Sequence, residues 1–152
     1  MLSSARNQLH GVVSAIVPGA INAEVEIRLA GGESVVAAIT RESLHNLAIE
    51  IGKPALALIK APHILLVSDF GGYRLSARNQ LSGTVTSLKS GPVNTEVELQ
   101  LKGGESIVST ITHESSQNLV LRKGQSVTAV FKAGSVILAV EDYSAQSKRS
   151  IK

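Results

Sequence analysis

Ser4-Ala5-Arg6-Asn7-Gln8-Leu9 returns as Ser76-Ala77-Arg78-Asn79-Gln80-Leu81, and the likeness between the two parts of the chain continues from there without a gap. Across 4–68 and 76–140, roughly 30 of about 65 aligned pairs are identical, far more than a shared composition would produce. The chain is therefore a tandem duplication. The residues that both copies keep are those that the repeated unit needs.

The repeat divides the 152-residue chain into two small units. We predict a first module over 1–69, a linker over 70–75, a second module over 76–140 and a polar, disordered tail over 141–152. A core of about 65 residues buries a small fraction of its surface, so we expect the modules to pack on each other and on other chains. Hydrophobic residues form 43% of the chain but aromatic residues only 3%, so aliphatic side chains must fill the cores.

Alternating polarity predicts β-strands in each module. From Ile21 to Leu29 every odd position is apolar and every even position is polar, which is the pattern of a half-buried strand. Gly31-Gly32 then predicts a tight hairpin, because glycine accepts the positive φ angles of such turns. Thr40, followed by Glu42, has the N-cap and the first-turn acid of a short helix.

The complete order per module is three strands, one short helix and two strands. The other strands of the first module are expected at 8–17, 34–39, 55–60 and 63–67, and the second module repeats this order. Five short strands with a helix between the third and the fourth is the order of an OB-type barrel. The predicted fold class is all-β, with two tandem OB-like five-stranded β-barrel modules that each have one short helix.

Composition excludes several classes of protein. The chain has no cysteine, which excludes disulfides, thiolate metal sites and cysteine nucleophiles. The N-terminus lacks the pattern of a signal peptide, and no apolar run approaches 18 residues, so we expect a cytoplasmic protein without a membrane partner. The net charge of +3 is modestly basic and suits a small anionic ligand as well as a nucleic acid.

Four hydrogen-bond donors from three separate segments survive in both copies. They are Arg6, Thr40, Ser43 and Lys60, repeated as Arg78, Thr112, Ser115 and Lys132. Fixed cations, hydroxyl groups and backbone N–H groups at a helix start are the donors that a tetrahedral oxyanion needs. Carboxylates beside the anion would oppose binding, and we expect the retained Glu42 and Glu114 to point outward.

A plainer interpretation stays open at this point. Thr40 and Ser43 equally suit a helix cap, and Arg6 and Lys60 suit solvated surface charges. Surface positions elsewhere have diverged, for example Val17 to Lys89. Joint retention of the donors against that background favours a binding site.

Other chemistries have weaker support. The four histidines are all replaced across the repeat and fit no zinc template. Neither a Ser-His-Asp arrangement nor a carboxylate pair repeats, so we do not expect an enzyme. Two Phe, two Tyr and no Trp are too few for the stacking surfaces of a nucleic-acid-binding OB fold.

Several motifs occur twice in one order: Ser-Ala-Arg-Asn-Gln-Leu-x-Gly, Asn-x-Glu-Val-Glu, Ile-Thr-x-Glu-Ser and Lys-Ala. In this the chain resembles the molbindin, or Mop, family over both modules. The resemblance to two-module members implies a cytoplasmic protein that binds molybdate or tungstate for storage, without an organic cofactor or a directly ligated metal. It also implies a homotrimer of two-module chains, with oxyanions held at module and subunit interfaces.

The resemblance implies two matching sets of oxyanion-binding residues, each completed by a facing module. The first set is Ser4, Ala5, Arg6 and Asn7 with Thr40, Ser43, Lys60 and Ala61, and the second is Ser76, Ala77, Arg78 and Asn79 with Thr112, Ser115, Lys132 and Ala133. A second class of oxyanion site is expected around Asn22 and Asn94. Pro62 corresponds to Gly134 in the second copy, so the repeat is not exact beside the lysine. This difference in loop shape could make the two halves unequal in affinity for the anion.

Three functional hypotheses follow. The first is binding of molybdate or tungstate for intracellular molybdenum storage and homeostasis. The second is a detached sensory or oligomerisation module of a molybdate transporter or regulator, because Mop modules also occur in such proteins. The third, an OB-type nucleic-acid binder, has the least support because of the missing aromatic residues.

Overall fold

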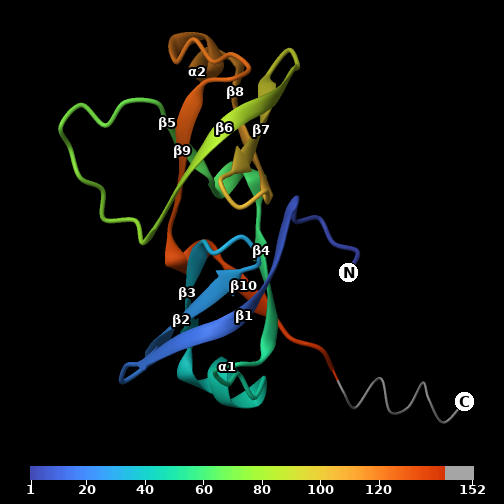
Figure 1. Ribbon diagram of the computed structural model, residues 1–152, viewed down its shortest axis with the longest axis vertical. Coiled ribbons are helices and arrows are strands. Elements are labelled where there is room, and N and C mark those ends of the chain that lie inside the picture. The colour runs from blue at the N-terminus through green and yellow to red at the C-terminus, as the bar shows by residue number, and fades with distance from the viewer. Residues whose placement is uncertain (143–152) are drawn as a thin grey trace, which may run out of the picture.

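The computed structural model describes residues 1–142 and shows two curled five-stranded sheets, one above the other in Figure 1. The predicted tail falls mostly on residues 143–152, which lie outside the described part. The elements of the first repeat are β1 (Asn7–Pro18), β2 (Asn22–Leu29), β3 (Ser34–Thr40), α1 (Arg41–Asn46), β4 (Pro54–Ile59), η1 (Ala61–His63) and β5 (Leu65–Val67). Those of the second are β6 (Asn79–Ser90), β7 (Asn94–Leu101), β8 (Ser106–Thr112), α2 (His113–Asn118), β9 (Ser126–Phe131), η2 (Ala133–Ser135) and β10 (Ile137–Ala139).

The predicted fold class is confirmed, and the two repeats follow the same register. β1 and β6 are long strands that pair antiparallel with a neighbour on each side. Each has an irregularity at the same place, between Val13 and Ala15 and between Val85 and Ser87. Such bulges bend a strand strongly, which allows one long strand to serve both halves of a curled sheet.

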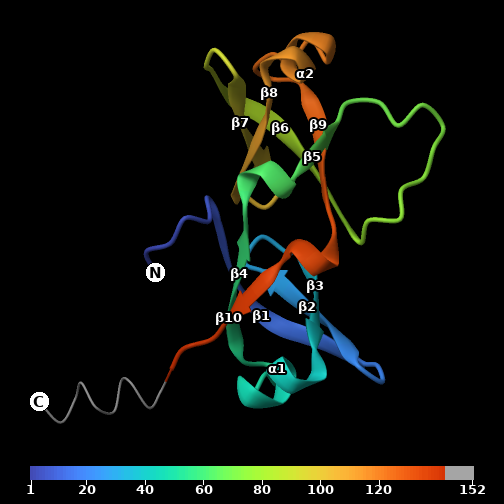
Figure 2. The same cartoon turned by 180° about the vertical axis from the view of Figure 1, so that it is seen from behind.

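The last strand of each repeat does not join its own sheet. The strand order is β10-β4-β1-β2-β3 in one sheet and β5-β9-β6-β7-β8 in the other, so β5 and β10 are exchanged between the repeats. Figure 2 shows β10 beside β4 in the lower sheet, whereas β5 lies beside β9 in the upper one. Each five-stranded sheet therefore contains four strands of one repeat and the last strand of the other, which the order of strands along the sequence did not indicate. The short turns η1 and η2 direct each last strand across to the other sheet.

Exchange of the strands joins the two halves into one buried core. The side chains of both repeats, from Leu9 to Leu138, form a continuous hydrophobic cluster that includes Ile64 and Val136 of the crossing segments. η1 packs against β8 of the second repeat, and η2 packs against β3 of the first. Two small modules thereby share one core that is larger than either could bury alone.

The two hairpin turns also meet. A Cβ atom on Gly31 would lie 2.3 Å from the Cα of Gly103, so only glycine allows the two backbones to approach so closely. The Gly31 N–H donates to Oε1 of Glu105 at 2.7 Å, and the Gly103 N–H donates to Oε1 of Glu33 at 2.9 Å. These reciprocal bonds hold the hairpins against each other.

The helices α1 and α2 lie at opposite ends of the molecule (Figure 1). The loop from β5 to β6, which connects the repeats, extends to one side of the two sheets. In the linker, the Tyr73 N–H donates to the carbonyl of Phe70 at 2.9 Å, and Gly71 and Gly72 take φ angles of 59° and 84°. Among residues 1–142, no helix is long and apolar enough to cross a membrane.

Candidate oxyanion-binding site

Arg6 and Lys60 flank the end of the β1–β4 ladder, in the region between the two sheets that we call the waist. Asn7 pairs with Ile59 at the end of the β1–β4 ladder, so the two basic residues are the next ones along neighbouring strands. Arg78 and Lys132 are equivalent, because Asn79 pairs with Phe131. Each arginine is therefore near the lysine of its own repeat along the backbone, and its pairing with a lysine of a facing module stays a prediction.

The remaining waist residues are arranged around these cations. Lys60 and Lys132 are exposed, whereas Ala61 and Ala133, the first residues of η1 and η2, are buried. In the second repeat, Ser76, Ala77 and Lys132 line one surface hollow. Ser4 is exposed at the start of the first repeat. The waist thus offers cationic and hydroxyl donors at the surface.

Each arginine reaches across to a glutamate of the other repeat. The Arg6 guanidinium donates from Nη1 and Nη2 to the two carboxylate oxygens of Glu96, at 2.7 and 2.8 Å. Arg78 Nη1 donates to Oε1 of Glu24 at 3.0 Å. The hydrogen bond from Arg6 lowers the pKa of Glu96, and the same bond raises the pKa of Arg6.

The second and third strands lead from these ion pairs toward the helix start. Glu24 lies opposite Ala38, and Asn22 lies opposite Thr40, so all four side chains are on one face of β2–β3. At about 3.4 Å per residue, Asn22 and Thr40 are about 7 Å further along the strands than Glu24 and Ala38. Glu24, the partner of Arg78, therefore shares one strand face with Asn22 and Thr40. Glu96, the partner of Arg6, shares the equivalent face with Asn94 and Thr112.

The hydroxyl groups at the helix starts form caps. Oγ1 of Thr40 accepts the Ser43 N–H at 3.0 Å, and the Thr40 hydroxyl donates to Oγ of Ser43. Thr112 and Ser115 repeat this geometry. The interpretation of these residues as helix caps is thus confirmed. Thr40, Thr112 and Ser115 are nevertheless exposed, and Ser43 is partly exposed.

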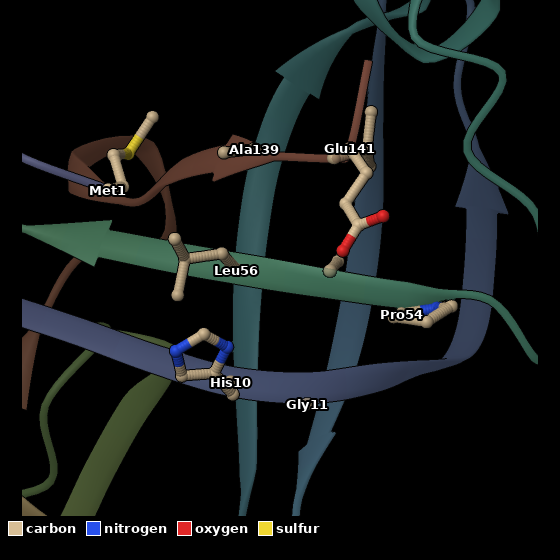
Figure 3. Close-up of a pocket in the computed structure, with 9 residues that line it drawn as sticks. Met1, His10, Gly11, Pro54, Leu56, Ala139 and Glu141 are labelled. Atoms are coloured by element: carbon tan, nitrogen blue, oxygen red, sulfur yellow. The ribbon is translucent and has the colours of Figure 1, made fainter. Parts of the chain in front are cut away.

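Another hollow, away from the waist, has the wrong chemistry for an anion. It lies on the outer face of the sheet formed by β1, β4 and β10, where His10 and Leu56 lie side by side with Met1 across from them (Figure 3). Glu141 points over its far end, next to Pro54. Residues 1–142 contain no group of three or more His, Asp or Glu side chains that could hold a metal ion. The waist is therefore the better candidate.

Comparison with protein families identifies the repeat. Residues 3–66 and 75–138 each match the TOBE domain. The chain belongs to the TOBE domain family. The two TOBE repeats coincide with the duplication that the sequence displays, and the predicted resemblance to Mop proteins is confirmed by the relatives of the chain.

The most informative relative is a solved structure of the cytoplasmic molybdate-binding protein ModG with molybdate bound. It is 50% identical, has a TM-score of 0.90, and the match covers 93% of this chain and 100% of that one. The molybdenum transport protein ModE of Herbaspirillum seropedicae is 43% identical over 141 residues, which are 93% of this chain and 52% of that protein. The molybdenum-pterin-binding protein MopA of Rhodobacter capsulatus is 43% identical over 140 residues, which are 92% of this chain and 53% of that protein. The chain thus spans about half the length of these two curated relatives.

Within the TOBE repeats, Asn7 and Asn79, two of the residues expected at the site, are buried between the repeats. The Asn7 amide donates to the carbonyls of Ile59 and Val108 at 3.2 and 2.8 Å and accepts the Val108 N–H at 2.7 Å. Asn79 pairs in the same way with the N–H and carbonyl of Val36. Both are buried, so these side chains join β1 and β6 to the third strand of the other repeat. Their side-chain amides are thus engaged within the protein, and a role of these residues in anion binding stays a prediction.

Sequence reasoning missed Glu24 and Glu96 as neighbours of the arginines. The signal was available, because both glutamates lie in the retained Asn-x-Glu-Val-Glu motif. Because the glutamates alternate with buried residues along the strand, the sequence predicts only that their side chains point away from the core. Which cation they meet depends on how the repeats pack.

Proposed function

We propose that this TOBE chain binds molybdate or tungstate and serves intracellular molybdenum storage or homeostasis, as a cytoplasmic binding protein rather than an enzyme. The observation that supports this most strongly is the likeness to ModG, which extends over both repeats and the whole of that protein. The waist chemistry agrees, because each repeat supplies an exposed arginine and an exposed lysine that flank the end of the same strand ladder. Charge-assisted hydrogen bonds from such groups are the strong ones for an oxyanion.

The proposed binding residues are the twice-retained donors. Arginine and lysine side chains would neutralise the charge, Thr and Ser hydroxyls would satisfy further oxygens, and the alanines would offer only backbone N–H groups. We propose Ser4, Ala5, Arg6, Thr40, Ser43, Lys60 and Ala61, with Ser76, Ala77, Arg78, Thr112, Ser115, Lys132 and Ala133. Asn22 and Asn94 are proposed for a second class of site, since they lie opposite Thr40 and Thr112.

We further propose that the working form is a homo-oligomer, a trimer of two-repeat chains. Apolar side chains are exposed at equivalent positions of both repeats. Ile21 and Val93 directly precede β2 and β7, and Leu65 and Ile137 lie on the exchanged strands β5 and β10. Apolar residues exposed twice at matching positions suit contact with other copies. Such contacts would bring the helix starts of one chain to the lysines of another and complete the donor sets.

Isothermal titration calorimetry with sodium molybdate, sodium tungstate and sodium sulfate tests the proposal. We expect binding of the first two and much weaker binding of sulfate. Absence of heat with molybdate and tungstate, or equal affinity for sulfate, would contradict it. Native mass spectrometry with and without molybdate would count subunits and anions together. A monomer that binds molybdate would contradict the trimer alone.

A second function is favoured by one observation. ModE relatives are about twice as long as this chain, so the repeats also form part of a larger transport or regulatory protein. The chain could then be a sensory or oligomerisation module that passes the anion-bound state to a partner. Co-purification of a stoichiometric transporter or regulator from the native cell, strengthened by molybdate, would favour this function. We expect no nucleic-acid binding, and a salt-sensitive gel shift would contradict that.

A further inference from the structure

We propose that Glu96 and Glu24 compete with the oxyanion for Arg6 and Arg78, so that each donor cluster contains its own carboxylate occupant. This inference rests on the proposed function. It assigns to the two glutamates a role that weakens binding and sets its apparent strength. Both are retained in the duplication together with the arginines that they contact.

The contact geometry supports competition. Glu96 presents two oxygens to Nη1 and Nη2 of Arg6, at 2.7 and 2.8 Å. A tetrahedral oxyanion presents two oxygens along one edge in the same manner, and a guanidinium has one such pair of terminal nitrogens. The same N–H groups cannot point at both partners. Arg6 therefore has to leave Glu96, in whole or in part, before it can bind an anion through that edge.

Both ion pairs are exposed enough to open. The side chains of Arg6 and Glu96 are 53% and 30% exposed, and those of Arg78 and Glu24 are 56% and 36% exposed. Solvent competes for such pairs, so they are weak. When only a fraction of chains has the arginine free, the apparent dissociation constant is the intrinsic constant divided by that fraction. The glutamate then lowers affinity without abolishing it.

The two repeats are not equal in this respect. Arg6 makes two hydrogen bonds to its glutamate, whereas Arg78 makes one, at 3.0 Å. The negative charge of Glu98 also attracts Arg6. Lys89, which lies opposite Glu96 in the β6–β7 ladder, attracts the Glu96 carboxylate. We therefore expect the cluster with Arg78 to bind molybdate before the cluster with Arg6.

The alternative role for a glutamate is to hold its arginine in the binding position. The two roles predict opposite signs. If Glu96 competes, Glu96→Gln raises the affinity, because a neutral amide holds the guanidinium less strongly. If Glu96 positions Arg6, the same substitution lowers the affinity.

The experiment uses calorimetric titration of the full chain with sodium molybdate in an Arg78→Gln background, which leaves the Arg6 cluster to be measured. We expect Glu96→Gln to tighten binding by about two- to fivefold, the range set by the strength of an exposed ion pair. Glu98→Gln is the matched control, since it removes an equal charge two residues along the same strand and no hydrogen bond joins Glu98 to Arg6 among the described contacts. We expect no more than a small change from it. Glu24→Gln in an Arg6→Gln background should tighten binding less than Glu96→Gln does.

The outcomes separate the two proposals. Unchanged or weaker binding by Glu96→Gln overturns competition while molybdate binding by the parent chain upholds the proposed function. Equal tightening by Glu98→Gln also overturns competition, because the effect is then one of general charge. Absence of molybdate binding by the unmodified chain overturns the proposed function itself. Thermal melting and native mass of each variant verify that fold and assembly are unchanged, and Glu96→Asp, which keeps the charge but shortens the reach, serves as a second variant.

Discussion

Ser109 of the second repeat corresponds to Ala37 of the first, and Thr95 corresponds to Ala23. All four are buried, yet only the second repeat fills these positions with hydroxyl groups. The Ser109 hydroxyl donates to the carbonyl of Ile64 at 2.6 Å, and Thr95 Oγ1 lies 3.2 Å from Oγ of Ser116. The segment leading to β5 is therefore bonded to the other repeat by a side chain that has no equivalent at β10.

The outer faces of the sheets differ as well. Leu56, which lines the hollow in Figure 3, corresponds to Thr128 of the second repeat, and the exposed Val12 on β1 corresponds to Thr84. In contrast, the arginine–glutamate pairs, the buried asparagines and the meeting glycines that join the two repeats are the same in both. The duplication has thus kept these contacts between its halves, although the Ser109 bond and the outer faces differ. Five predictions test that distinction, in order of decreasing effect.

The largest effect is expected where the hairpins meet. Gly31→Ala should lower the free energy of unfolding by about 3 kcal/mol, because the new methyl group would overlap the Gly103 backbone and neither chain can withdraw easily. Urea denaturation measures this. Gly134→Ala is the control, since a Cβ there meets nothing within 4 Å. A cost for Gly31→Ala no larger than that of the control would contradict the close approach.

Substitution of the buried asparagines should have the second-largest effect on stability. Asn7→Ala should cost about 2–3 kcal/mol, because it leaves the buried Val108 N–H and carbonyl without their partner. Asn79→Ala should cost somewhat less, because Val36 is less buried than Val108. Chemical denaturation of both variants compares the repeats directly. Equal and negligible costs would show that these amides do not hold the halves together.

The extra hydroxyl at the crossing segment should have a smaller effect. Ser109→Ala should cost about 1 kcal/mol, the usual net value of one buried hydrogen bond. Ala37→Ser offers the reverse test, since it places a hydroxyl opposite Val136. Hydrogen exchange of the Ile64 segment should quicken in the first variant. No change in exchange or stability would remove this asymmetry between the repeats.

A helix end provides a strain test. Ala48 and Val120 both have a φ of 51°, a left-handed conformation that a β-branched side chain tolerates poorly. Val120→Gly should therefore stabilise the protein by about 0.5 kcal/mol, and Ala48→Gly should have almost no effect. Differential scanning calorimetry compares the two. Destabilisation by Val120→Gly would mean that contacts of the valine outweigh its strain.

The smallest expected effect is a dependence on pH. The folded pKa of Glu96 is lowered by Arg6, so the ion pair contributes stability above the unfolded glutamate pKa of about 4.3 and loses it as the pH falls through the folded value. The melting temperature of the parent chain should exceed that of Glu96→Gln slightly at pH 7. The difference should vanish near pH 3. A difference that persists in acid would mean that the substitution acts through packing.

Much of the proposed site consists of residues that the duplication retained. Arg6, Lys60 and their copies were recognisable because the two halves agree there while neighbouring surface residues do not. The role of Asn7 was not recognisable, since an asparagine within a polar motif looks alike whether it binds a ligand or a neighbouring strand. The carboxylates beside the arginines were overlooked for a related reason. Glu96 is ninety residues from Arg6, and only packing makes them neighbours.

The sequence by itself determined the two repeats, their strands, the glycine turns and the capped helices, because each depends on residues close together along the chain. Only the tertiary structure decided that β5 and β10 are exchanged. The two last strands have nearly the same pattern, Leu65–Val67 and Ile137–Ala139, and backbone hydrogen bonds do not distinguish one repeat from its copy. The choice depends instead on where the turns at Ala61 and Ala133 send the chain, and on the buried contacts that the crossing segments gain from the opposite sheet.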